Sequence, residues 1–287
     1  MFCSGKELFV MLNNYYENMD EKPLDRICEN GGATAIFRSI ACIGDSLASG
    51  EFQLPEKDGK WSYHDMYEYS WGQFIARMIG SKVYNFSRGG MTAKWYCDSF
   101  ADENGFWDKE KAAQCYIMAL GVNDVTQIIQ QKLQFGSISD IADNYLENKE
   151  TFVGYYSRII ARYKEISPYA KFFLVTCPKC CEREELYDMH SKLIYEIADH
   201  FDNTYVIDLR KYGAEYDADF KEAYYLCGHM SPTGYLYTAK IISSYIDYII
   251  RNNPNDFKTV GLINTELQNK IKDISLNISN ACLMGEV

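Results

Sequence analysis

Five short apolar segments, rich in β-branched and aromatic residues, recur along the chain with longer amphipathic segments between them. Each has the length of a buried strand, and runs of this kind are typical of strands that are covered on both faces. Strands that alternate with helices form parallel sheets between two helical layers. The sequence therefore predicts an α/β fold with strands at 37–44, 82–87, 115–121, 171–177 and 204–209.

The intervening segments carry apolar residues at every third or fourth position, which is the period of an amphipathic helix. The clearest case is 152–166, which the Ser167-Pro168 pair ends because the residue before proline disfavours helical geometry. Further helices are expected at 70–80, at 186–201 and from Pro232 to the Asn252-Asn253-Pro254 stop.

The length of 287 residues fits one α/β domain with additions at its ends. We expect the domain to span 36–254, between a helical N-terminal extension at 1–35 and a C-terminal extension at 255–287. The N-terminal extension has an amphipathic helix around residues 8–16 and a second short helix that ends at Gly31-Gly32, and the C-terminal extension has apolar residues at helical spacing from Leu267 to Ile278. Neither extension has enough apolar residues to fold alone. Both are therefore expected to pack on the core or on a second subunit, which makes a homo-oligomer one of the open arrangements.

Charge and hydropathy exclude several classes of partner. The net charge of −11 disfavours nucleic acid, and no window of 18 apolar residues is present to cross a membrane. The apolar stretch Leu8–Leu12 is too short for a secretory signal, so a cytoplasmic location with reduced cysteines is expected. Cys177, Cys180 and Cys181 lack a second ligand pair, so we expect no metal and no cofactor.

Polar residues follow the first predicted strand directly. The apolar run ends at Gly44, and Asp45 and Ser46 come next. Parallel sheets bind ligands at the carboxyl ends of their strands, where residues 87–92 and 121–124 also lie. Ser46 is therefore either a helix cap or a nucleophile, and the residue type alone leaves both roles open.

One of the four histidines lies where a catalytic base is expected. His190 and His200 fall on a predicted helix, and His64 lies in a loop with no comparable flanking pattern. His229 follows a glycine and precedes the start of the last core helix. Since a base and a nucleophile normally come from separate strand-end loops, His229 is the base candidate, with a structural role as the alternative.

At these residues the sequence resembles the SGNH, or GDSL, hydrolases, which are esterases and acylhydrolases. Gly44-Asp45-Ser46-Leu47 matches the first block of that family, and three further blocks follow in the family's order. They are NFSRGGMT at 85–92, GVND at 121–124 and GHMSPTG at 228–234. The resemblance covers 37 to about 250 and implies a flavodoxin-like α/β/α sandwich of three layers around a five-stranded, mainly parallel sheet.

The resemblance also implies roles for individual residues. Ser46 would attack the ester carbonyl and His229 would carry the proton. The backbone N–H groups of Ser46 and Gly90 and the side chain of Asn123 would form the oxyanion hole, which stabilises the charge that develops on the carbonyl oxygen. Gly89 is the rival of Gly90, and a Gly-Met-Thr sequence favours Gly90.

Two aspartates beside these residues have a structural interpretation. Asp45 and Asp124 each follow a strand end, and aspartate commonly accepts hydrogen bonds from nearby backbone N–H groups. We therefore expect both carboxylates to shape the turns that carry Ser46 and Asn123.

The sequence departs from the family at one position. The family has an aspartate three residues before the histidine, whereas this chain has Leu226. Three outcomes are open. A backbone carbonyl near Leu226 orients His229, a carboxylate such as Asp208 or Glu222 substitutes, or catalysis is weak or lost.

The segment 51–70 is expected to overhang the strand ends and, with residues 88–107, to border the site. We therefore expect a serine esterase or acylhydrolase acting on small or carbohydrate-borne acyl esters. A non-catalytic ligand-binding protein and an acyltransferase are the alternatives. Side chains that line an acyl or sugar pocket, or pack these loops on the core, are Trp61, Tyr63, Arg88, Trp95 and Tyr96.

Overall fold

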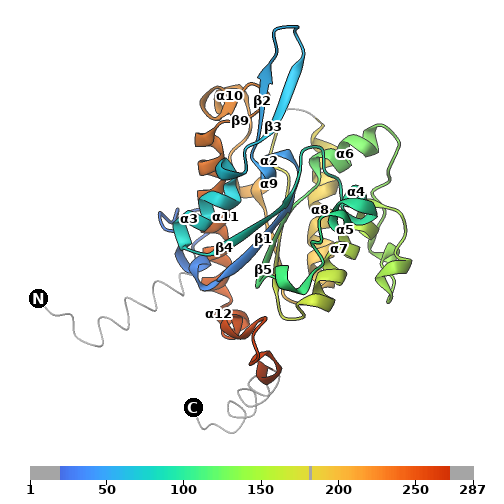
Figure 1. The fold of residues 1–287 in the computed structure, drawn as a ribbon, viewed down its shortest axis with the longest axis vertical. Coiled ribbons are helices and arrows are strands. Elements are labelled where there is room, and N and C mark those ends of the chain that lie inside the picture. The colour runs from blue at the N-terminus through green and yellow to red at the C-terminus, as the bar shows by residue number, and fades with distance from the viewer. Residues whose placement is uncertain (1–19, 181–182, 272–287) are drawn as a thin grey trace, which may run out of the picture.

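The computed structural model describes residues 20–180 and 183–271, which form a sheet between two layers of helices (Figure 1). The five strands of the central sheet are all parallel and follow the order β4-β1-β5-β6-β7. Their bounds are β1 Ser39–Gly44, β4 Lys82–Ser87, β5 Cys115–Ala119, β6 Lys171–Val175 and β7 Thr204–Ile207. The predicted fold class is confirmed.

The predicted strands differ from the observed ones only at their ends. Three of them leave the ladder two residues earlier than predicted, after Ala119, Val175 and Ile207. The following residues Leu120, Thr176 and Asp208 remain buried although they belong to no strand. An apolar run therefore predicted burial correctly but overestimated the length of backbone pairing.

Two helices cover each face of the sheet. Helices α3 (Trp71–Ile79) and α11 (Pro232–Asn252) pack on one face, and α7 (Phe152–Ile166) and α8 (Glu184–His200) pack on the other (Figure 1). These four are the helices that the apolar period predicts.

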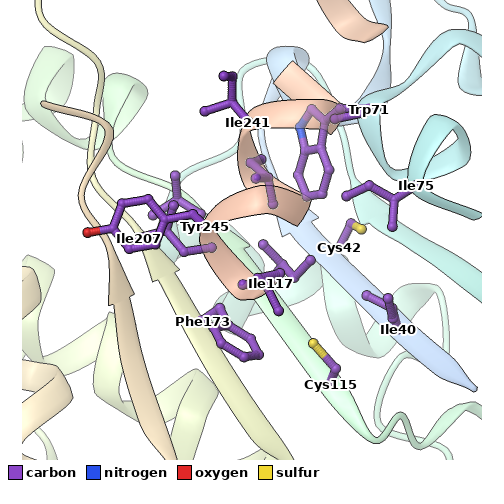
Figure 2. Packing of buried hydrophobic residues seen from close by; sticks show 14 of the residues in the cluster. Ile40, Cys42, Trp71, Ile75, Cys115, Ile117, Phe173, Ile207, Ile241 and Tyr245 are labelled. Carbon is purple, nitrogen blue, oxygen red and sulfur yellow. The ribbon is translucent and has the colours of Figure 1, made fainter. Parts of the chain in front are cut away.

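Successive residues of a strand point to opposite faces, so each strand contributes to both cores. In β1, Ile40 and Cys42 belong to the core under α3 and α11, whereas Ala41 and Ile43 belong to the core under α7 and α8. Figure 2 shows the first of these cores, where strand side chains meet those of the covering helices. Its labelled members are Ile40, Cys42, Trp71, Ile75, Cys115, Ile117, Phe173, Ile207, Ile241 and Tyr245.

A β-hairpin stands at the carboxyl end of the sheet, above the strand ends (Figure 1). It consists of β2 (Glu51–Pro55) and β3 (Trp61–Asp65), which pair antiparallel. The hairpin is the predicted overhanging segment. A second antiparallel pair, β8 (Tyr225–Leu226) with β9 (His229–Met230), precedes α11.

Short helices occupy the connections. The α-helices are α2 Ser46–Ser49, α4 Ala93–Trp95, α5 Ala101–Glu103, α6 Val122–Ile129, α9 Leu209–Tyr212, α10 Ala218–Tyr224 and α12 Pro254–Phe257. A π-helical turn covers Tyr96–Phe100. The 3₁₀ turns are Gly32–Ile36, Tyr67–Tyr69, Lys109–Lys111, Ile138–Asp140, Tyr145–Glu147, Val260–Leu262 and Gln268–Lys270.

The described part of the N-terminal extension differs from its prediction. Residues 20–31 form turns in place of the second short helix, and the first predicted helix lies outside the described residues. This segment and the 3₁₀ turn after it are bonded to α11: the Cys28 N–H donates to Ser244 Oγ, and the Ala33 N–H of the turn donates to Asp247 Oδ1. Partners on another element replace the bonds that a helix would make within itself.

The described part of the C-terminal extension packs on the first core. Phe257, Val260, Ile263 and Ile271 are buried there. The helix expected around 267–278 is represented only by the 3₁₀ turn Gln268–Lys270, and its remainder lies outside the described residues. Throughout 20–180 and 183–271, no helix has the length and apolar composition that spanning a bilayer requires.

Candidate active site

Three strand-end loops meet at the carboxyl edge of the sheet. Strand β1 lies between β4 and β5, and Gly44 is in register with Ser87 on one side and Ala119 on the other. Residues 45–46, 88–92 and 120–124 therefore leave neighbouring strands at the same level. The predicted nucleophile, glycine and asparagine blocks come together here.

Ser46 is the first residue of α2, directly after the end of β1. Asp45 caps this helix by accepting a hydrogen bond from the Leu47 N–H at 3.0 Å. A Cβ on Gly44 would lie 2.5 Å from the Ala48 Cβ, so α2 folds back on the strand only because residue 44 is glycine. Ser46 is partly exposed, and within the described residues its hydroxyl makes no hydrogen bond.

Asn123 and Asp124 connect this turn to the glycine loop. The Asn123 amide donates to the Met91 carbonyl at 3.2 Å and, at 3.4 Å, to Asp45 Oδ2. Asp124 Oδ1 accepts from the Ala93 N–H at 2.9 Å. Both aspartates thus bond backbone N–H groups and shape turns, which is the role the sequence suggests for them.

Different constraints favour glycine at positions 89 and 90: a close side-chain contact at Gly89 and the backbone conformation at Gly90. Gly90 has a φ of 74°, a left-handed conformation that side chains disfavour, and the space around its absent Cβ is open. A Cβ on Gly89 would lie 2.1 Å from Glu51 Oε2, so a carboxylate from the hairpin occupies that space. The assignment of Gly90 as an oxyanion donor stays a prediction.

Burial raises the pKa of both turn aspartates. The pKa of Asp45 rises to about 6 and that of Asp124 to about 7, with burial as the largest cause. Asp124 Oδ2 has no hydrogen-bond partner within the described residues, which agrees with a carboxyl group that favours its neutral form.

The free energy of unfolding of the Asp124→Asn variant is expected to rise above that of wild type as the pH increases. Because the folded protein holds the Asp124 proton more tightly than the unfolded chain, wild-type stability falls from about pH 4 to about pH 7. The difference reaches at most about 4 kcal/mol at about 1.4 kcal/mol per pKa unit. Urea unfolding of both proteins across this range measures it, and parallel pH profiles would contradict it.

His229 is the first residue of β9, and β9 contacts α2, the short helix that begins at Ser46. Two side chains of β2 contact its ring. His229 Nε2 is 3.2 Å from Glu51 Oε1, and Nδ1 is 3.3 Å from Gln53 Oε1. The Tyr63 ring meets the imidazole edge to face, with the ring centroids 6.0 Å apart. The base candidate is thus held by the hairpin.

The carboxylates predicted as possible orienting acids do not contact His229. Asp208 caps α9 through the Lys211 N–H, and it also accepts hydrogen bonds from Thr176 and Tyr195. Glu222 is exposed on α10. The oxygen found at Nδ1 is that of the Gln53 side chain, in place of a carbonyl near Leu226.

The sequence interpretation missed Glu51 and Gln53. A signal was present, because the polar residues 51 and 53 alternate with the apolar Phe52 and Leu54 as in a strand with one wet face. Nothing local indicates that this face meets residue 229, which is 176 positions away from residue 53.

The predicted aromatic walls divide into exposed and buried residues. Trp61 and Tyr63 are about half exposed on β3, at 50% and 55%. Trp95 borders a surface pocket of about 230 Å³ with Thr92 and Gln127, and the Arg88 guanidinium lies 5.5 Å from a Trp95 ring centroid. All four are at the surface: Arg88 and Trp95 follow the end of β4, whereas Trp61 pairs with Pro55 near the tip of the hairpin.

Tyr96 does not line the site, and that prediction is wrong. The side chain is fully buried in the core under α7 and α8, where its hydroxyl bonds the Tyr163 hydroxyl at 2.6 Å. Trp95 and Tyr96 are consecutive on a helical turn, so they point in different directions.

Metal ligation finds no support in the described residues, where no cluster of three or more His, Cys, Asp and Glu side chains is arranged to hold an ion. Cys177 is buried, and burial raises its pKa well above the usual value. Cys181 lies outside the described residues.

Solved structures similar to this one show the same fold. A protein from Lactobacillus plantarum aligns with a TM-score of 0.54 at 14% identity, over 74% of this chain and 97% of that one. A family two carbohydrate esterase from Clostridium thermocellum, solved in complex with cellohexaose, aligns with a TM-score of 0.52 at 17% identity. That alignment covers 82% of this chain and 66% of the esterase.

Sequence comparison supplies the family. A search of curated protein sequences finds no match. The profile of the family described as GDSL-like Lipase/Acylhydrolase matches residues 40–242, from β1 to the middle of α11. This range contains the serine, glycine, asparagine and histidine blocks that the fold brings to one edge. The chain therefore belongs to the GDSL-like lipase/acylhydrolase family and is a carboxylic ester hydrolase.

Proposed function

We propose that this protein is a serine esterase that cleaves small or carbohydrate-borne acyl esters through an acyl-enzyme on Ser46, with His229 as the base. The observation that carries the proposal is the meeting of α2 and β9 at the carboxyl edge of the sheet. Helix α2 begins at Ser46 and β9 begins at His229, so their contact supports a shared site for these residues, beside the loops that carry Gly90 and Asn123.

The first half-reaction forms the acyl-enzyme. Ser46 Oγ attacks the ester carbonyl while the imidazole of His229 accepts the hydroxyl proton. The carbonyl oxygen becomes negative, and the N–H groups of Ser46 and Gly90 with the Asn123 amide stabilise it. The protonated imidazole then donates its proton to the leaving alcohol. In the second half-reaction, water activated by the same imidazole attacks the acyl group and releases the acid.

Gln53 takes the place of the family's aspartate in this mechanism. With its oxygen at Nδ1, the amide accepts a hydrogen bond from Nδ1–H, and Nε2 is the nitrogen that can accept a proton. A neutral amide orients the ring but stabilises an imidazolium less than a carboxylate does. The proposed enzyme is therefore slower than one with an aspartate at this nitrogen.

The variant Gln53→Leu is expected to lower kcat by about tenfold with little change in KM. The loss corresponds to one hydrogen bond of about 1.4 kcal/mol that orients the base. Steady-state kinetics on 4-nitrophenyl acetate measure it, with Gln73→Leu on α3 as the matched control. Equal kcat values for wild type and Gln53→Leu would remove Gln53 from the mechanism.

The proposed substrate class depends on exposed aromatic side chains of the hairpin and of the turn after β4. Trp61, Tyr63 and Trp95 present exposed ring surface, and sugar rings stack on such surfaces. The similar esterase from Clostridium thermocellum was solved with cellohexaose bound, which supports a carbohydrate as the alcohol component.

Trapping of the acyl-enzyme tests the proposal. Brief incubation with 4-nitrophenyl acetate followed by acid quench and mass spectrometry is expected to place one acetyl group on the peptide that contains Ser46. A second assay compares kcat/KM for acetylated saccharides with kcat/KM for water-soluble aliphatic esters, and the proposal expects activity on both classes. Accumulation of an acetylated sugar acceptor instead of free acetate would assign acyl transfer, and absence of both reactions would assign ligand binding.

A further inference from the structure

Two side chains on one face of β2 hold both nitrogens of the His229 ring. Glu51 and Gln53 are two positions apart, so they point to the same side of the strand. Their oxygens lie 3.2 Å from Nε2 and 3.3 Å from Nδ1, respectively. Gln53 has a role in the proposed mechanism, whereas Glu51 does not. The following inference concerns Glu51 and rests on the proposed function.

The Glu51 carboxyl group fills the space between the base and the glycine loop. Glu51 is only 9% exposed, and its second oxygen lies against Gly89, where a Cβ would come within 2.1 Å of it. The Glu51 carbonyl accepts a hydrogen bond from the Tyr235 hydroxyl of α11 at 2.7 Å, which fixes the backbone at this position. The carboxyl group is therefore held in a defined position and is largely shielded from solvent.

The protonation state of the pair decides what Glu51 does there: an ionised Glu51 pairs with an imidazolium, and a protonated Glu51 donates to a neutral imidazole. A neutral imidazole has one N–H donor and one acceptor nitrogen. With Gln53 Oε1 at Nδ1, the neutral imidazole that fits carries its proton on Nδ1 and has its acceptor nitrogen at Nε2, which a donor can occupy. The Glu51 carboxyl group is such a donor only in its protonated form.

The surroundings of the pair favour this neutral arrangement. Burial, and then the carboxylates of Asp65 on β3 and Asp45 before α2, raise the pKa of Glu51 to about 7. Burial lowers the pKa of His229. Two tyrosines face the pair: the Tyr235 hydroxyl of α11 donates to the Glu51 carbonyl, and the Tyr63 ring of β3 contacts the imidazole. Both groups are thus neutral, and the proton between them belongs to the Glu51 carboxyl group, which donates a hydrogen bond to Nε2.

We propose that Glu51 is a positioning residue whose protonated carboxyl group binds Nε2 and blocks His229 from acting as the base. His229 accepts the Ser46 proton only after Glu51 has lost its own proton. Once ionised, the carboxylate faces the lone pair of Nε2 and is repelled by it, which frees this nitrogen. Activity therefore increases with pH as Glu51 ionises.

The pH dependence of Glu51→Ala tests the proposal in the full-length enzyme. Its kcat/KM relative to wild type is expected to be about tenfold higher at pH 6 and about twofold higher at pH 7. The two proteins become equal near pH 9, where wild-type Glu51 is ionised. Glu56→Ala, which removes an exposed carboxylate from the same hairpin, is expected to match wild type at every pH. A ratio that is flat with pH, or below one throughout, would overturn the proposal.

Histidine NMR tests the contact without reference to activity. In wild type, the Nε2 resonance of ¹⁵N-labelled His229, assigned by its loss in His229→Gln, is expected to shift as Glu51 loses its proton near pH 7. In Glu51→Gln, which keeps the shape but cannot ionise, this step disappears and His229 titrates at lower pH. Identical titration curves would overturn the proposal. Activity that survives Ser46→Ala would instead reject the proposed function and leave this measurement valid.

Discussion

Replacement of Ser46 by alanine lowers kcat/KM for a small acyl ester by about 10⁴-fold or more, because the reaction loses its nucleophile. Steady-state assays with purified protein measure this loss. The variant should remain folded, because Ser46 is partly exposed and its hydroxyl makes no hydrogen bond within the described residues. Ser139→Ala, at an exposed serine of a distant 3₁₀ turn, is the matched control and should keep wild-type activity.

His229 and Ser46 are expected to act as one unit. The double variant Ser46→Ala/His229→Ala should be no slower than the slower of the two single variants, since residues of one proton-transfer unit are not additive. Additive losses would show two independent roles. More than half of the wild-type rate in Ser46→Ala would reject the nucleophile assignment outright.

The variant Arg251→Ala is expected to lower the free energy of unfolding by about 3–5 kcal/mol, because it leaves buried carboxylates without their cation. The Arg251 side chain is 1% exposed and bonds both oxygens of Glu21 at 2.8 and 2.7 Å. Its Nε also donates to Asp247 Oδ2 at 2.8 Å. The midpoint of urea unfolding at neutral pH measures the loss.

Arg77→Ala provides the control for this prediction. Arg77 pairs with Glu68 at 3.8 Å on the surface, where both side chains are largely in water. Such exposed pairs contribute less than about 1 kcal/mol. Similar midpoints for Arg251→Ala and wild type would show that the buried network adds no net stability. Faster proteolysis of residues 20–31 in Arg251→Ala would show that the network also fixes this segment on α11.

The sequence predicted where the candidate blocks lie in the fold, because they are short segments that directly follow predicted strands. The apolar runs set the strands, the strands set one edge, and the residues that follow β1 and β5 must emerge there whatever the details of packing. The caps were local as well: Ser70, Thr151 and Ser231 each accept a backbone hydrogen bond at the start of a predicted helix.

Side chains that act across long sequence distances were not predictable in this way. Asp208 carries a plausible carboxylate, but its own helix cap and Thr176 engage it. Tyr96 has the chemistry of a pocket wall, but the turn that carries it directs it into the core. In both cases local packing engages the side chain elsewhere. The residue type alone does not show whether such a side chain lies in the site or packs in the core.

By itself the sequence determined the parallel sheet, its covering helices and the edge at which Ser46, Asn123 and His229 emerge, because period and residue chemistry are local properties. Only the tertiary structure decided what surrounds the imidazole. The hairpin of β2 and β3 folds over the strand ends and presents Glu51 and Gln53 to His229. That contact depends on the angle at which one segment docks on another, and no periodicity in either segment encodes such an angle.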